Sequence, residues 1–170
     1  MEFRKEVLIK AQSVQLVCFD VDGVLTSGAI TYSDDGRELK SFHVRDGAAI
    51  KLLLTSGIEV AILTGRSSAI VERRARELGI RHLYQGLSDK LPALDQLAEK
   101  LKLTTSEVAH VGDDLPDLDV FSRVGLSITV ADGHPEVLAR ADFVTTKSGG
   151  HGVASEVAEL ILRAKGCWPY

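Results

Sequence analysis

Short apolar runs alternate along this chain with longer segments in which apolar residues recur every three or four positions. The short runs are typical of strands buried on both faces of a parallel sheet, and the longer segments are typical of amphipathic helices. Right-handed crossovers between parallel strands place helices on both faces of the sheet. The alternation therefore predicts an α/β fold built on a doubly wound parallel sheet. The expected strands are Leu16–Phe19, Val60–Leu63, His82–Tyr84, Val108–Val111, Ile128–Val130 and Phe143–Val144, and the expected helices are Ala48–Leu54, Ala69–Leu78, Pro92–Leu101, Leu118–Phe121 and Val153–Leu162.

One segment interrupts this alternation. Residues Ala29–Ser33 and Glu38–Val44 flank the turn sequence Asp34-Asp35-Gly36. Because Asp and Gly favour tight turns between paired strands, we expect a small β-hairpin inserted after the first strand. No Pro- or Ser-rich linker, repeat or low-complexity tract divides the 170 residues. A chain of this length is the size of one domain, so we expect residues 1–170 to form a single domain.

Composition and charge argue against several classes of partner. The net charge is −4, and acidic and basic residues are mixed along the chain, so no basic stripe predicts nucleic-acid binding. The first ten residues lack the apolar core of a secretory leader, and no apolar run approaches the ~20 residues that span a bilayer. Of two cysteines, Cys18 lies in an expected buried strand, which fits a reducing compartment. We therefore expect a cytoplasmic protein without a nucleic-acid or membrane partner.

Polar residues follow three of the expected strands at the point where each strand ends. Asp20 and Asp22 follow the first strand, Thr64-Gly65-Arg66 follows the second, and Gly112-Asp113-Asp114 follows the strand at Val108. Each motif alone also fits a simple turn, loop or helix cap. Ligands of open α/β sheets bind outside the carboxyl ends of the strands, however, and here several strands deliver polar groups to that edge. The convergence predicts a functional site there.

The residue types at this edge suit phosphoryl transfer. Two carboxylates as close as Asp20 and Asp22 need a cation or a proton between them, and Mg²⁺ prefers such oxygens, with Asp113 available as a third ligand. A carboxylate can attack phosphorus to form an aspartyl-phosphate, and a second acid, Asp22, can protonate the leaving oxygen and then activate water. The charge on the transferred group would be met by local donors. These donors are the Thr64 hydroxyl, the Gly65 N–H and the Lys90 ammonium.

The same residues, in the same order, resemble the four motifs of the haloacid dehalogenase-like (HAD) phosphohydrolase superfamily. The motifs are Asp20-Val21-Asp22-Gly23-Val24-Leu25-Thr26, Thr64-Gly65, Lys90 and Gly112-Asp113-Asp114-Leu115-Pro116-Asp117. The resemblance implies a Rossmann-like sheet, Asp20 as the nucleophile and Asp22 as the general acid/base. It also implies Mg²⁺ on the Asp20 carboxylate, the Asp22 carbonyl and Asp113. Thr64 and Lys90 would bind the phosphoryl group. Asp114 and Asp117 would be supporting residues that orient the metal shell or Lys90.

Many members of that superfamily carry a cap domain, for which this chain has no room. The stretches Leu25–Thr64 and Arg66–Lys90 are too short, so the site should be open in a monomer. The hairpin and several short segments resemble the 3-deoxy-D-manno-octulosonate 8-phosphate (KDO 8-phosphate) phosphatases, which act in lipopolysaccharide precursor biosynthesis. That resemblance implies a homotetramer whose neighbouring subunits help to close each site. The segments are Phe42-His43-Val44-Arg45-Asp46-Gly47, Leu83-Tyr84-Gln85-Gly86 and Gly149-Gly150-His151-Gly152.

The resemblance also suggests the substrate contacts Arg66, Arg45 and His151. Arg66 can pair bidentately with a carboxylate such as that of KDO 8-phosphate. Related phosphatases for nine-carbon sugar acids have Glu at this position, so Arg66 favours the eight-carbon substrate. Two departures leave the substrate open, because His151 stands where the family has Arg or Lys, and Ala48 stands where it has Tyr. A neutral His would weaken anion binding.

Other functions remain as alternatives. One is a capless phosphatase acting on a nine-carbon nonulosonate 9-phosphate or on a macromolecule. Another is a phosphoacceptor signalling domain, a class that is also doubly wound and uses an acidic pair, a Thr or Ser and a Lys. The second acid two residues after Asp20 favours turnover over a stable phosphoprotein, because it can activate water against the aspartyl-phosphate. We therefore expect a Mg²⁺-dependent phosphoric monoester hydrolase.

Overall fold

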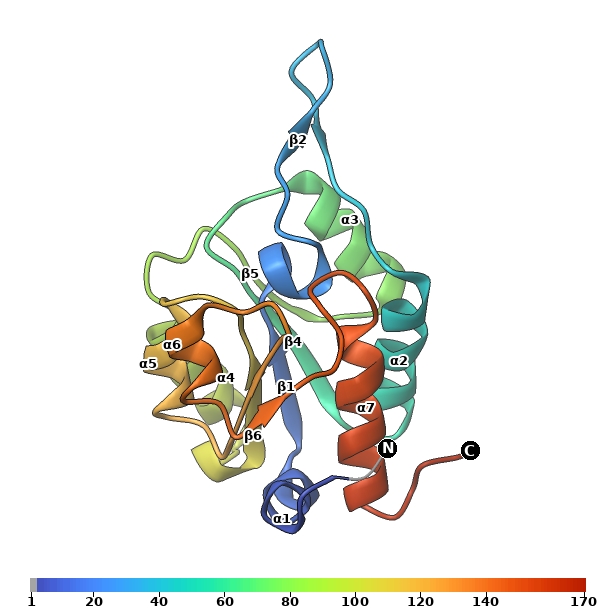
Figure 1. Cartoon of the computed structure of the whole chain (residues 1–170), viewed down its shortest axis with the longest axis vertical. Helices are drawn as coiled ribbons and strands as arrows, with labels where there is room; N and C mark the ends of the chain where they lie inside the picture. Colours follow the sequence, from blue (N-terminus) through green and yellow to red (C-terminus); the bar gives the residue numbers. More distant parts are fainter. Residues whose placement is uncertain (1–2) are drawn as a thin grey trace.

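A computed structural model describes residues 3–170 (Figure 1). Its main sheet has six strands, all parallel, in the order β5-β4-β1-β6-β7-β8. The central strand β1 pairs with β4 on one side and β6 on the other, and every residue of β1 is buried. The predicted doubly wound α/β sheet is therefore confirmed. The strands are β1 (Leu16–Phe19), β4 (Glu59–Leu63), β5 (His82–Tyr84), β6 (Val108–Val111), β7 (Leu126–Thr129) and β8 (Phe143–Val144).

Helices cover both faces of this sheet, because side chains alternate sides along each strand. Val17 and Phe19 of β1 face a core shared with α1, α2, α3 and α7, whereas Leu16 and Cys18 face a core shared with α4 and α5. Both layers are visible in Figure 1. The helices are α1 (Lys5–Ser13), α2 (Val44–Thr55), α3 (Ala69–Leu78), α4 (Leu91–Leu101), α5 (Asp117–Phe121), α6 (Pro135–Leu138) and α7 (Val153–Ala164).

The predicted hairpin is present but shorter than expected. Strands β2 (Thr31–Tyr32) and β3 (Glu38–Leu39) pair antiparallel and project from the body at the carboxyl edge of the sheet (Figure 1). The chain does not remain extended to Val44, where α2 already begins. The His43 side chain accepts a hydrogen bond from the Arg45 N–H, which caps that helix and explains its early start.

Other element boundaries also differ from expectation. Helices α1 and α6 were not predicted, because α1 has only two buried residues, Val7 and Ala11, and α6 has only four residues in all. Strand β7 begins at Leu126, two residues before the predicted start. Within residues 3–170, no helix is long and apolar enough to cross a membrane.

Candidate active site

A cleft of about 240 Å³ opens at the carboxyl edge of the sheet. Nine of the eleven residues that the sequence indicated line it, from the ends of β1, β4 and β6 and from the start of α4 and α5. The convergence predicted from the strand ends is therefore present in the fold. The lining residues are Asp20, Asp22, Thr64, Gly65, Arg66, Leu87, Ser88, Lys90, Asp113, Asp114, Pro116 and Asp117.

Asp20 continues β1 into the cleft. Its N–H donates to the Val111 carbonyl at 2.9 Å, which extends the pairing with β6, and its Oδ1 accepts the Val21 N–H at 2.7 Å. Its Oδ2 lies 3.0 Å from Lys90 Nζ. Burial raises the pKa of Asp20 above its ordinary value, although Lys90 works against this rise. The Asp20 carboxylate is thus fixed and turned toward the cleft.

The turn after Asp20 requires glycine. Gly23 has a φ of +95°, a conformation that L side chains rarely adopt. A Cβ at this position would also lie only 2.0 Å from Asp113 Oδ2. The turn therefore brings the backbone after β1 directly against the carboxylate that follows β6.

Three carboxylates gather beside this turn. Oxygen atoms of Asp20, Asp113 and Asp117 all lie within 4.8 Å of one another. Asp113 Oδ1 is buried and has no hydrogen-bond partner among the described residues. Burial and then the neighbouring Asp20 raise the pKa of Asp113 to about 7. An uncompensated buried carboxylate in an all-oxygen donor set fits a divalent cation such as Mg²⁺.

The Asp117 carboxylate is already saturated by donors. Its Oδ1 lies 2.7 Å from Lys90 Nζ and 2.7 Å from His110 Nε2. Its Oδ2 accepts the backbone N–H groups of Asp113 and Asp114, at 3.1 and 3.3 Å. Burial alone would raise the pKa of Asp117, but His110 and Lys90 hold it below its ordinary value. Asp117 therefore suits the predicted supporting role of orienting Lys90, and Asp20 and Asp113 are better placed for a metal.

Lys90 joins the two acids although it is almost completely buried. Burial alone would lower the pKa of Lys90, but Asp20 and Asp117 raise it above its ordinary value. A charged ammonium therefore stands beside Asp20, where a phosphoryl group would arrive. Asp114 plays a smaller part, because it is exposed and its Oδ1 accepts the Leu115 N–H.

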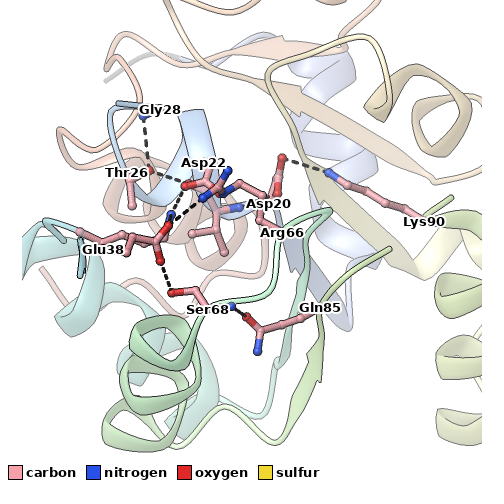
Figure 2. A network of polar contacts seen from close by, with 11 residues as sticks. Asp20, Asp22, Thr26, Gly28, Glu38, Arg66, Ser68, Gln85 and Lys90 are labelled. Atoms are coloured by element: carbon pink, nitrogen blue, oxygen red, sulfur yellow. Dashed lines mark hydrogen bonds and ion pairs between the residues drawn. The ribbon is translucent and has the colours of Figure 1, made fainter. Parts of the chain in front are cut away.

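The Asp22 carboxylate points to the other side of the cleft, toward the hairpin (Figure 2). Lys40 Nζ contacts its Oδ1, and Arg66 Nε lies 3.6 Å from its Oδ2. Glu38 Oε1 accepts from Arg66 Nη2 at 2.9 Å, and Glu38 Oε2 accepts from Ser68 Oγ at 2.7 Å. The sequence interpretation missed Lys40, Glu38 and Ser68. The two-residue spacing of positions 38 and 40, which puts both side chains on one face of an extended strand, was the available signal.

Two predicted substrate residues lie outside the cleft of this chain. Arg45 is exposed in the first turn of α2. His151 is exposed in the loop before α7, and its Nδ1 lies 2.7 Å from the Gly149 carbonyl oxygen. That loop packs on the Gly23 turn, since a Cβ at Gly149 would lie 2.0 Å from the Gly23 carbonyl oxygen. The loop therefore supports the turn.

Comparisons with known proteins agree with this geometry. The haloacid dehalogenase-like hydrolase family matches residues 83–157. The 3-deoxy-D-manno-octulosonate 8-phosphate phosphatase of Escherichia coli K12 is 52% identical over 161 residues, which are 95% of this chain and 86% of the relative. This chain belongs to the KDO 8-phosphate phosphatase family. The family predicted from the motifs is thereby confirmed.

Solved structures of KDO 8-phosphate phosphatases share the whole architecture. The Yersinia pestis enzyme is 48% identical with a TM-score of 0.94, over 96% of this chain and 88% of that one. The Moraxella catarrhalis enzyme, solved with magnesium, phosphate and KDO, is 48% identical with a TM-score of 0.94, over 96% and 94% of the two chains. The family match over residues 83–157 includes Lys90 and Asp113 but begins after Asp20 and Thr64. For the first half of the site, the similarity therefore comes from these whole-chain relatives.

Proposed function

We propose that this chain is a Mg²⁺-dependent phosphatase that hydrolyses KDO 8-phosphate to KDO and phosphate through an aspartyl-phosphate on Asp20. One observation carries the proposal. Asp20 lies 3.0 Å from the Lys90 ammonium and within 4.8 Å of a carboxylate oxygen of Asp113, whose Oδ1 is buried and has no hydrogen-bond partner among the described residues. The cleft thus brings together a nucleophile, Asp20, a cation for the phosphoryl group, Lys90, and a carboxylate that can bind a metal, Asp113.

The metal would be held by the carboxylates of Asp20 and Asp113 and the backbone carbonyl of Asp22. When bound, Mg²⁺ neutralises charge on the phosphate oxygens and on the crowded acids. The similar M. catarrhalis enzyme was solved with a magnesium ion and phosphate, which supports this choice of cofactor. Lys90 would bind a phosphoryl oxygen, and Thr64 and Gly65 at the end of β4 would supply further donors.

The chemistry needs two displacements at phosphorus. In the first, a carboxylate oxygen of Asp20 attacks phosphorus, the bond from phosphorus to the C8 oxygen breaks, and Asp22 gives its proton to that oxygen. In the second, Asp22 takes a proton from water, which attacks the aspartyl-phosphate and releases phosphate. The second displacement restores the Asp20 carboxylate and the protonated form of Asp22. Lys90 lies beside Asp20, whereas the Asp22 carboxylate is held by Lys40 on the hairpin side. This arrangement fits a role for Lys90 in binding the phosphoryl group and a role for Asp22 in proton transfer.

The sugar-acid substrate is supported by Arg66 at the mouth of the cleft. Its side chain is 41% exposed, although its Nη2 donates to Glu38 Oε1. A guanidinium there can receive the carboxylate of KDO 8-phosphate. The alternatives, a nine-carbon nonulosonate 9-phosphate or a signalling role, are not favoured by the similar Escherichia coli and Yersinia pestis proteins, which are KDO 8-phosphate phosphatases at 52% and 49% identity.

We place the enzyme in the cytoplasm, in lipopolysaccharide precursor biosynthesis, as one domain of residues 1–170 that assembles into a homotetramer. Between Leu25 and Thr64 the described chain holds the hairpin, α2 and β4, and between Arg66 and Lys90 it holds α3 and β5, so neither stretch forms a cap over the cleft. Apolar side chains on the hairpin are exposed, with Tyr32 at 60% and Leu39 at 52%. Burial of such side chains against neighbouring subunits would stabilise an assembly that closes each site. Arg45 and His151, which lie outside this chain's own cleft, would then be candidates for contacts across that assembly.

Phosphate release from KDO 8-phosphate, beside nine-carbon sugar-acid phosphates, tests the function. We expect activity with the eight-carbon substrate that requires Mg²⁺ and disappears in Asp20→Asn. Full activity of Asp20→Asn would exclude the covalent route. Preference for a nine-carbon substrate would exclude KDO 8-phosphate as the main substrate. Sedimentation equilibrium tests the tetramer separately, because a monomer at micromolar concentration would contradict the assembly but not the chemistry.

A further inference from the structure

A buried ammonium lies where the hairpin joins the body of the molecule. The Lys40 side chain is only 2% exposed, although β2 and β3 next to it are largely solvent-accessible. Its Nζ contacts Asp22 Oδ1 and lies 3.5 Å from Glu38 Oε1. A charge removed from water in this way is costly unless it is paired, so its position is set by these two carboxylates.

The pairing continues as a ring of alternating charges, of which Figure 2 labels Asp22, Glu38 and Arg66. Asp22 lies between Lys40 and Arg66, and Arg66 in turn binds Glu38, which closes the ring to Lys40. Two acids and two bases cancel in formal charge. Ser68 fixes the ring to the start of α3 by donating to Glu38 Oε2 at 2.7 Å. The hairpin, the Gly23 turn and α3 are thus joined through side chains around Asp22.

Within this ring, Lys40 is the stronger constraint on Asp22. The Lys40 side chain is only 2% exposed and its ammonium hydrogen-bonds to Asp22 Oδ1, whereas Arg66 Nε is 3.6 Å from Asp22 and its side chain is 41% exposed. Without Lys40, the carboxylate could rotate about its side-chain torsions on the cleft wall. A general acid must reach the leaving oxygen within hydrogen-bonding distance, and misplacement of a reacting group by about 1 Å can cost 10²-fold in rate.

We propose that Lys40 is a positioning residue for Asp22, so that the hairpin supplies part of the geometry of leaving-group protonation. The inference rests on the proposed function, in which Asp22 is the general acid. It assigns the hairpin a role in the chemistry within one chain. The competing role for Lys40 is anchorage of the hairpin alone.

Leaving-group dependence separates the two roles. Lys40→Met keeps the length of the side chain and removes its charge. We would measure kcat/KM with Mg²⁺ for a series from 4-nitrophenyl phosphate, whose leaving group needs no proton, through less acidic phenols to alkyl phosphates and KDO 8-phosphate. A misplaced acid should lower the alkyl values about 10- to 100-fold and the 4-nitrophenyl value less than about threefold. The dependence on leaving-group acidity should therefore steepen toward that of Asp22→Asn.

Matched variants complete the test. Arg37→Met removes a hairpin cation that is 82% exposed and pairs with Asp35 at the tip, so its profile should match the wild type. Lys40→Arg, which keeps the charge, should recover part of the alkyl activity. Thermal melting of each variant checks folding, and Lys40→Gln replaces Lys40→Met if the latter does not fold.

The outcomes divide cleanly. An equal fall across the whole series, or an unchanged series in Lys40→Met, would overturn the positioning role while leaving the phosphatase intact. Activity on aryl and alkyl phosphates without activity on KDO 8-phosphate would remove the proposed substrate and still decide the role of Lys40. A wild-type protein that hydrolyses none of these esters would overturn both.

Discussion

The carboxylate of Asp113 should destabilise the protein when no metal is bound. Its Oδ1 is buried and has no hydrogen-bond partner within residues 3–170, and Asp20 and Asp117 lie beside it. Burial and these negative neighbours raise its pKa from 3.8 to about 7. Between these two values the folded, metal-free protein binds more protons than the unfolded chain, so the free energy of unfolding falls as pH rises.

The size of this effect follows from the shift. Three pH units at about 1.4 kcal/mol each give an upper limit of about 4 kcal/mol. Because the residue is not fully buried, solvent screens part of the repulsion, and we expect about 2 kcal/mol at pH 7.5 and about 1 kcal/mol at pH 5. Asp113→Asn keeps the shape and removes the charge. In EDTA this variant should therefore be more stable than the wild type by these amounts.

Urea denaturation in EDTA at the two pH values measures the difference. Asp119→Asn, which removes an exposed charge in the same region, is the control and should show no such dependence on pH. Added Mg²⁺ at 100 times its Kd should stabilise the wild type by about 2.7 kcal/mol and Asp113→Asn much less. If Asp113→Asn is less stable than the wild type in EDTA at pH 7.5, or if the gap is the same at both pH values, the reasoning is wrong.

Three further predictions concern the groups around Asp20. Lys90→Met should lower kcat for phosphate release at least 10²-fold and the free energy of unfolding by about 3 kcal/mol, because Asp20 and Asp117 lose their buried cation. Near-normal activity of this variant would refute Lys90 as the cation that binds the phosphoryl group. His110→Gln can place a donor where Nε2 lies and should keep kcat within about threefold, whereas His110→Asn cannot reach Asp117 and should lose about tenfold. Equal losses in the two variants would show that His110 acts only through packing. Gly23→Ala should lower the melting temperature and weaken Mg²⁺ binding measured by calorimetry. The reason is that the new Cβ would clash with Asp113 and that a φ of +95° is strained for alanine. Unchanged Mg²⁺ affinity would contradict the close approach of the Gly23 turn to Asp113.

The sequence alone determined the architecture and the order of the site. Strands that are buried in a parallel sheet consist of short apolar runs. The sequence therefore predicted β1 and β6 with the residue bounds that the structure has. The rule that ligands bind at the carboxyl ends of strands then predicts that Asp20, Thr64 and Asp113 lie together. These predictions succeed because they depend on the local spacing of apolar residues and on the direction of each strand, and the sequence alone provides both.

Only the tertiary structure decided which charges neutralise one another. Lys90 and Asp117 are 27 residues apart, and Lys40 and Asp22 are 18 apart, so no local pattern pairs them. The sequence predicted His110 as one residue of an apolar strand and Lys40 as one residue of the inserted hairpin. The energetic cost of a buried charge depends on every neighbour that packs around it, and those neighbours come from separate elements. The roles proposed for Lys40 and His110 therefore follow from packing, whereas Asp20 was proposed as the nucleophile from its motif at the end of β1 alone.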